Sequence, residues 1–196
     1  MAEVKVLVEG YAKEINGKEC ASSTCTLIID GKTKVIVDPG MDKKKLLSAL
    51  KKESLTPKDI DYVILSHTHP DHMLLTAIFD NALILDDGAT YSFDAKISEH
   101  NGNVPGTDIK IMPTPGHDQF HCATIVKTDK GIIVIAADVF WWLDKDEQKT
   151  DRKSLLEHKD PYVKDQKALL ESRKKILDVA DWIIPGHGKM FRVKKW

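Results

Sequence analysis

Residues 67–72 read HTHPDH and follow directly on an apolar run. His67 and His69 stand two positions apart in an extended segment, so both side chains can point the same way. Asp71 and His72 come where a helix begins, and the positive end of that helix favours a carboxylate. Side chains of metal-binding type gathered at the end of one strand predict a metal site there.

Three further candidate ligands also stand just after apolar runs: His117, Asp138 and His187. Loops at the ends of strands are where a fold places its functional side chains. Together with the first four they make seven ligands, whereas a closed structural zinc site uses about four. The set therefore predicts two divalent metal ions, with one carboxylate left to bridge them. Imidazole and carboxylate ligands favour zinc, and iron or manganese are also compatible with them.

The composition fits a soluble globular protein and argues against several other classes of protein. The 196 residues carry 29 Lys and Arg against 30 Asp and Glu, with 42% hydrophobic residues. This length suits a single domain over residues 1–196, and the charge balance gives no overall signal for nucleic acid or for disorder. No apolar stretch reaches the roughly 20 residues of a membrane span, so no membrane partner is expected.

The cysteines and the start of the sequence favour a cytoplasmic location. Three cysteines, at no spacing typical of a zinc finger or a disulfide scaffold, suit a reducing compartment. The N-terminal stretch has no charged segment followed by an apolar one, which is the pattern of a signal peptide. We therefore expect a cytoplasmic protein.

The order of apolar runs and turns predicts a layered α/β fold rather than a doubly wound parallel sheet. Hairpins are expected around residues 30–32 and 129–131, because both turns separate β-branched runs. Helices are expected over 43–53, where leucines recur at helical spacing, and over 162–179. The charged stretch 141–160 is expected at the surface. Helices inserted between groups of strands place the two kinds of element in separate layers.

The HTHPDH stretch resembles the HxHxDH signature of the metallo-β-lactamase superfamily. Residues 114–117, 137–138 and 185–188 match the remaining motifs of that family in order, and residues 38–40 resemble its first motif. The resemblance covers nearly the whole chain. It implies a four-layer αββα sandwich, in the α+β class, with the metal ions at one edge between two sheets.

The same resemblance gives each candidate ligand a role. It implies one metal ion on His67, His69 and His117, a second on Asp71, His72 and His187, and a bridge at Asp138. Asp71 and Asp138 are the expected catalytic residues, and an alternative role for Asp71 is to orient the nucleophile. Asp38 is expected to orient the ligands through hydrogen bonds.

His121 and two tryptophans are candidates for a supporting role. His121 lies four residues past His117 and is expected to support a ligand or to touch the substrate; the alternative is a histidine that only makes hydrogen bonds. Trp141 and Trp142 follow Asp138 closely and are expected either to line the substrate pocket or to pack in the core. Apolar surface at these tryptophans or at Trp196 would suit a homodimer.

The predicted activity is hydrolysis, with a hydroxide shared by two metal ions as the nucleophile. Stretches of the chain's last third, at residues 160–161, 172–177, 179–188 and 191–193, resemble a branch of the family associated with ribonuclease activity in histone pre-mRNA processing. RNA is therefore the leading substrate, although the sequence departs from that branch at residues 118–122.

Two alternative activities remain open from the sequence. One is hydrolysis of a small thioester or lactone, in the manner of glyoxalase II, because the chain is compact and has no recognisable nucleic-acid module. The other is a persulfide dioxygenase with one iron ion. Asp138 stands where many β-lactamases have a cysteine ligand, which disfavours antibiotic hydrolysis as the native function.

Overall fold

The computed structural model, which describes residues 1–194, arranges most strands in two sheets. The first contains β1 (Glu3–Val8), β4 (Cys25–Asp30), β5 (Thr33–Val37), β6 (Tyr62–Ile64), β7 (Leu83–Leu85), β8 (Ala89–Tyr91) and β9 (Ile97–Glu99), in that order. The second contains β10 (Lys110–Pro113), β11 (Cys122–Thr128), β12 (Gly131–Trp141), β13 (Trp182–His187) and β14 (Phe191–Arg192). A separate hairpin pairs β2 (Tyr11–Ile15) with β3 (Lys18–Ser22).

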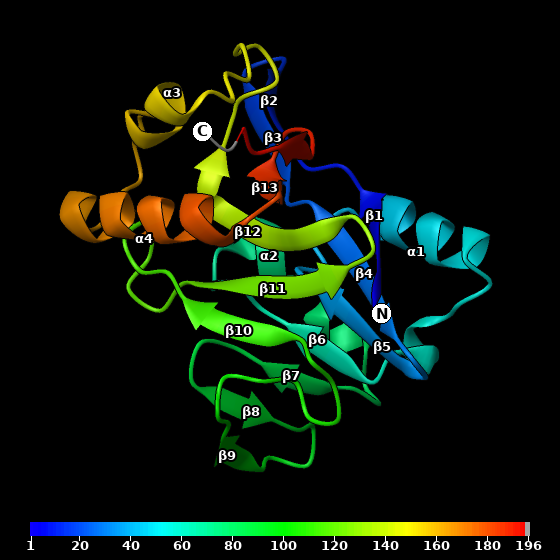
Figure 1. Cartoon of the computed structure of the whole chain (residues 1–196). Coiled ribbons are helices and arrows are strands. Elements are labelled where there is room, and N and C mark those ends of the chain that lie inside the picture. Colours follow the sequence, from blue (N-terminus) through cyan, green and yellow to red (C-terminus); the bar gives the residue numbers. More distant parts are fainter. Residues whose placement is uncertain (195–196) are drawn as a thin grey trace.

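Four α-helices complete the fold: α1 (Lys43–Lys52), α2 (Pro70–Met73), α3 (Arg152–Leu156) and α4 (Gln166–Val179). Short 3-10 helices occupy Pro57–Asp59 and Thr76–Ile78. In Figure 1, α4 lies across β12 and α1 lies beside β1. Within residues 1–194 no helix is long and apolar enough to cross a bilayer.

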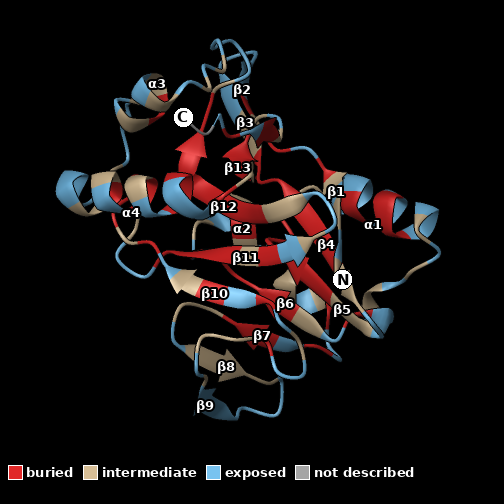
Figure 2. Ribbon diagram, in the orientation of Figure 1, coloured by how far each residue is buried: buried red, intermediate tan, exposed pale blue. Residues whose placement is uncertain are grey.

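Three clusters of buried side chains separate four layers. Between the two sheets, residues such as Ile28 and Ile64 of the first share a cluster with Ile135 and Ile184 of the second. On the outer faces, the first sheet packs against leucines of α1 and the second against apolar residues of α4. Figure 2 shows β4, β12 and β13 mostly buried and β2 and β9 mostly exposed, while α1 carries buried and exposed stripes. The predicted αββα sandwich is confirmed.

Several predicted elements are confirmed and two need correction. The hairpins β4–β5 and β11–β12 and the helix α1 lie where the sequence predicts them. The helix predicted from residue 162 instead begins at Gln166, because the Asp165 side chain caps it by accepting from the backbone N–H groups of the next turn. The stretch 141–160 is only partly at the surface, since Trp141 and Trp142 are buried.

The hairpin β2–β3 was not predicted, although its turn carries a recognisable signal. Asn16 and Gly17 both have positive φ, at 53° and 73°, which is the conformation that favours Asn-Gly in two-residue hairpin turns. The flanking strands are rich in lysine and glutamate, so they lack the apolar alternation of a half-buried strand. This hairpin forms one wall of the cavity described below.

The sheet edges bring distant parts of the chain to one place. The parallel partners β5 and β6 end side by side in the first sheet, and β12 and β13 do so in the second. The segment after β6 lies at the end of β13, where Asp71 Oδ2 is 3.1 Å from His187 Nε2. Asp138 lies within β12, where the pairing with β13 is irregular and the preceding Ala137 has a φ of 43°. The left-handed backbone of Ala137 coincides with this irregularity, directly before Asp138.

Candidate metal centre

The structure brings all seven predicted ligands together in two groups. The first is His67, His69, His117 and Asp138; the second is Asp71, His72 and His187. Within each group, one ligand atom per residue lies within 4.8 Å of all the others. The groups divide the side chains as the family resemblance implies.

Asp138 faces both groups with different oxygens. Its Oδ2 lies 3.4 Å from His117 Nε2, whereas its Oδ1 lies 3.2 Å from His72 Nε2 and 3.7 Å from His187 Nε2. In the second group, Asp71 Oδ2 lies 3.1 Å from His187 Nε2. A single carboxylate with one oxygen toward each group is the arrangement that a bridging ligand needs.

Several of these atoms are buried without a hydrogen-bond partner. Among residues 1–194, His67 Nε2, His72 Nε2 and Asp138 Oδ1 have none. Leaving a buried polar atom unsatisfied costs about 1–3 kcal/mol, so three at one point need a compensating interaction. Imidazole nitrogens and a carboxylate oxygen that converge in this way fit a divalent metal ion.

The second nitrogen of each of four rings is anchored to a hydrogen-bond partner. Two of these partners are carboxylates: His72 Nδ1 lies 2.8 Å from Asp38 Oδ2, and His117 Nδ1 lies 2.7 Å from Asp160 Oδ2. The other two are a carbonyl and a hydroxyl: His187 Nδ1 lies 3.1 Å from the Tyr11 carbonyl, and His67 Nδ1 lies 2.9 Å from Ser66 Oγ. Carboxylates and carbonyls only accept, so His72, His117 and His187 carry their protons on Nδ1. Each Nε2 lone pair is then free to face the cluster.

Asp38 lies where the resemblance places a residue that orients ligands. It is 1% exposed and accepts from Ser66 N at 2.8 Å and from Ser66 Oγ at 2.6 Å, as well as from His72. Because the Ser66 hydroxyl gives its proton to Asp38, it accepts one from His67 Nδ1. Asp38 therefore orients His72 directly and His67 through Ser66.

The charges at the centre stabilise each other. Burial would raise the pKa of Asp138, but His72 and His187 outweigh burial and hold that pKa well below its ordinary value. Burial likewise would lower the pKa of His72, yet Asp138 and Asp38 raise it well above the ordinary value. The pKa of His67 is lowered, first by burial and then by His72. The two carboxylates therefore make the surroundings of His72 negative, which favours a cation at this position.

Asp160 was not predicted as a site residue. It is 7% exposed, and its Oδ2 accepts from His117 Nδ1, 43 positions earlier in the chain. Burial would raise the pKa of Asp160, but the His117 imidazole outweighs it and lowers that pKa. No local pattern in the sequence pairs these residues, and the charged stretch around Asp160 is typical of a surface.

Asp160→Asn should weaken zinc binding about 10-fold, because hydrogen-bond partners of ligand histidines contribute about 10- to 100-fold to metal affinity. The amide has no negative charge to strengthen His117 as a ligand. Competition with a chromophoric chelator measures the affinity. Asp178→Asn is the matched control, since Asp178 pairs with Arg152 on the exposed face of α4. Equal zinc affinity in Asp160→Asn and the wild type would contradict this role.

His121 and the tryptophans lie near the centre but in neither ligand group. His121 is fully buried, bonds Thr114 Oγ1 through Nδ1 at 2.9 Å, and places its ring 5.0 Å from that of His67. Burial lowers the pKa of His121 to about 3, so this ring is neutral. Trp141 and Trp142 are 7% and 5% exposed and offer little surface to a partner. Trp196 lies outside the described residues.

A cavity of about 900 Å³ opens over the metal centre. Side chains of both ligand groups line it, including Asp71 and Asp138. Apolar wall residues are Met41, Trp141, Leu143, Pro161 and Tyr162, and the Trp141 and Tyr162 rings lie 5.7 Å apart. Trp142 does not line this cavity; it packs against Phe191 in the core and borders a neighbouring cavity.

Sequence comparisons match the chain to one family model and to several known proteins. The sequence model of the family described as "Metallo-beta-lactamase superfamily" matches residues 19–89. The chain is 32% identical over 201 residues to metallo-beta-lactamase domain-containing protein 1 of Xenopus laevis, covering 98% of this chain and 82% of the relative. It is 27% identical over 115 residues to an N-acyl homoserine lactonase of Bacillus cereus, covering 50% of this chain and 45% of that enzyme.

A solved structure shows the same fold. The crystal structure of a candidate metallo-beta-lactamase from Thermotoga maritima superposes with a TM-score of 0.72 at 17% identity, covering 97% of this chain and 99% of that one.

Proposed function

The chain belongs to the metallo-β-lactamase superfamily and is a metal-dependent hydrolase, and on this premise we propose that it works with two divalent ions, zinc in the first place. The observation that carries this proposal is the position of Asp138, whose two oxygens face the two groups of ligand atoms. A mononuclear iron dioxygenase would have no use for the complete second group. The three cysteines are free, which supports our proposal of a cytoplasmic location.

In this proposal each residue has a defined task. His67, His69 and His117 would hold one ion, Asp71, His72 and His187 the other, and Asp138 both. Two such ions, when bound, supply a Lewis acid for the substrate oxygen and an activated water for the attack. Asp71 also lines the cavity, so its carboxylate is placed to accept a hydrogen bond from a water or a substrate there. Trp141 closes the wall beside His187, with ring centres 6.2 Å apart.

We propose a small thioester or lactone as the substrate. The cavity wall is largely apolar and suits an acyl group. The charged residues that line it outside the ligand set are Lys13, Lys145, Glu14, Glu19 and Asp144. Lys13 is itself paired with Asp144 at 3.5 Å, so the mouth offers little attraction for a polyanion. The similarity to a lactonase supports the same class.

RNA is the second candidate substrate. It is supported by the resemblance of stretches in the last third of the chain to a branch of the family associated with ribonuclease activity. Trp141 and Tyr162, whose rings lie 5.7 Å apart at the cavity wall and are tilted by 34°, would then contact a base.

A paired assay separates the two substrates. Zinc-loaded protein is incubated with a panel of thioesters and lactones and, in parallel, with labelled single-stranded RNA. We expect ester turnover that disappears on dialysis against a chelator and returns with zinc, and no RNA cleavage above the metal-free control. Zinc-dependent RNA cleavage without ester turnover would replace our substrate by the second candidate.

A further inference from the structure

Arg173 on α4 is a buried charge that the proposed chemistry does not use. It is 0% exposed and is the largest fully buried side chain among residues 1–194. Burial lowers the pKa of Arg173 to about 10, so the group remains charged at neutral pH. A buried guanidinium is expensive, and an apolar residue of similar size would often give equal or greater stability. We therefore looked for a role of the Arg173 guanidinium other than stability.

The guanidinium joins two segments of the metal centre. Arg173 Nε donates to the Val139 carbonyl at 3.1 Å, and Nη1 donates to the His158 carbonyl at 2.6 Å. Val139 directly follows the shared ligand Asp138. His158 comes two residues before Asp160, the carboxylate that holds His117.

Further contacts fix the same loop. The side chain of His158 reaches back to β12, with Nε2 2.6 Å from the Trp141 carbonyl. Its Nε2 must be the donor, because a carbonyl only accepts. The segment around Asp160 is thus tied to β12 at two points, one through the His158 backbone and one through its ring. Asp160 also supplies the opposite charge that acts on the Arg173 guanidinium.

Helix α4 also contacts the turn that carries His117. Ser172 Oγ donates to the Pro115 carbonyl at 2.8 Å. At Gly116, with a φ of 138°, a Cβ atom would lie 2.3 Å from Leu169 Cα, so the turn and the helix touch through their backbones. Helix α4 therefore contacts the turn that carries His117 through Ser172, and its Arg173 bonds the segment that carries Asp160, the partner of His117.

We propose that Arg173 is a positioning residue for the metal centre. Its two hydrogen bonds, to the carbonyls of Val139 and His158, fix Asp160 and, through Asp160, the His117 imidazole. Lysine cannot replace it fully, because a single ammonium lacks the rigid fork that reaches both carbonyls. The inference rests on the proposed metal function and extends it to a residue outside the ligand set.

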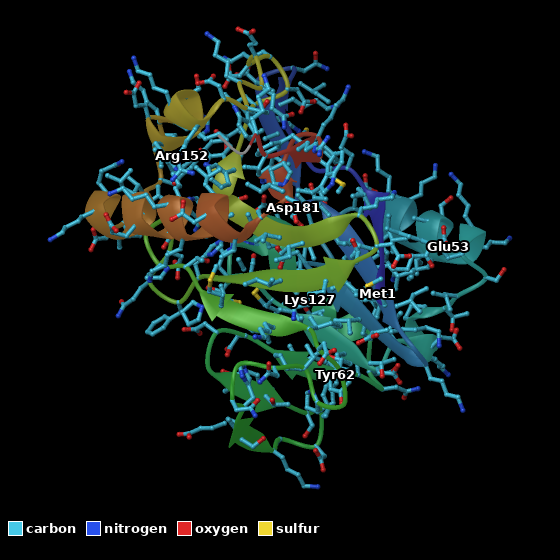
Figure 3. The ribbon with its side chains drawn as sticks, in the orientation of Figure 1. Met1, Glu53, Tyr62, Lys127, Arg152 and Asp181 are labelled. Atoms are coloured by element: carbon cyan, nitrogen blue, oxygen red, sulfur yellow. The ribbon has the colours of Figure 1, made fainter. Side chains whose placement is uncertain are left out.

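The test compares zinc affinities of folded variants by chelator competition. Arg173→Met should bind zinc about 10-fold more weakly than the wild type, the size expected for a supporting contact. The matched control is Arg152→Met. Arg152, labelled in Figure 3, is half-exposed at the start of α3. It bonds Asp178 Oδ1 at 2.7 Å, and Asp178 lies on α4, the helix that carries Arg173. We expect wild-type affinity in that control.

A double variant tests the route of the effect. If Arg173 acts through Asp160, then Arg173→Met added to Asp160→Asn should weaken zinc binding by no more than about twofold further, because coupled residues are not additive. A merely structural role would multiply the two losses. Full multiplication, or wild-type zinc affinity in folded Arg173→Met, overturns the proposal.

Circular dichroism and melting of the metal-free proteins establish that each variant is folded. Should Arg173→Met not fold, Arg173→Lys carries the test, since it keeps the charge and one donor. We expect about threefold weaker zinc binding in Arg173→Lys, and wild-type affinity there overturns the proposal. A wild-type chain that binds no zinc contradicts the proposed function and is thereby distinguished from a failure of this inference.

Discussion

Asp138→Ala should lower the rate of hydrolysis at least about 1,000-fold, since losing several kcal/mol of transition-state stabilisation by a metal centre has an effect of this order. Asp138 is the residue that faces both ligand groups, with Oδ2 3.4 Å from His117 Nε2 and Oδ1 3.2 Å from His72 Nε2. Its removal leaves each group one ligand short. We expect the variant to retain at most one zinc ion per chain, measured by elemental mass spectrometry beside the initial rate.

The control is Asp129→Ala, which removes an exposed carboxylate from the turn between β11 and β12. It should keep the full zinc content and rate. Asp138→Asn keeps the shape of the side chain but not its charge, so it should follow Asp138→Ala in zinc content. Full activity with full zinc content in Asp138→Ala would exclude our proposal that Asp138 bridges two metal ions.

The gathering of the seven candidate ligands could be predicted because it follows from a short-range rule. Asp138 and His187 lie in the apolar strands β12 and β13, and the other five candidate ligands lie in the segments that follow β6 and β10. Segments that follow strands are where a fold places its functional side chains. The layered fold follows from the same alternation of strands and helices. Both signals are local, so they can be read along the chain without knowledge of distant contacts.

Apart from Asp38, which the family resemblance indicated, the residues that support the ligands could not be predicted, because their partners are far away in sequence. Asp160 reaches His117 across 43 positions, and the Tyr11 carbonyl reaches His187 across 176. Arg173 meets Val139 and His158 only after α4 has packed on the second sheet. Aspartates and arginines in charged stretches usually lie at the surface, so composition alone points away from these roles.

A tertiary contact explains why helix α4 begins later than the sequence predicts. A helix from residue 162 would continue the apolar spacing back toward Tyr162. In the structure, the backbone N–H groups of Lys164 and Asp165 bind the Gly116 carbonyl at 2.8 and 2.9 Å. Those donors are therefore committed to the turn that carries His117, and the helix begins only after Asp165 has capped it. A tertiary contact at the site has shortened the helix.

Gly186→Ala should strongly impair the enzyme, although it changes no ligand. A Cβ atom at residue 186 would lie 1.8 Å from Asp138 Oδ1 and 3.0 Å from the Ala137 carbonyl carbon. The backbone of Gly186 cannot retreat easily, because its carbonyl accepts from Thr24 N at 2.7 Å and from Thr24 Oγ1 at 3.0 Å. The Asp138 carboxylate must therefore move away from the second group.

We expect at least about a 100-fold lower rate in Gly186→Ala, the effect of misplacing a reacting group by about 1 Å, together with a zinc content below two ions per chain. The control is Gly88→Ala, because a Cβ atom at Gly88 meets nothing within 4 Å. Melting of the metal-free proteins separates a displaced carboxylate from a general loss of folding. A folded Gly186→Ala with the wild-type rate and full zinc content would show that Asp138 Oδ1 is not needed where the structure places it, and the carboxylate would then serve one ion only.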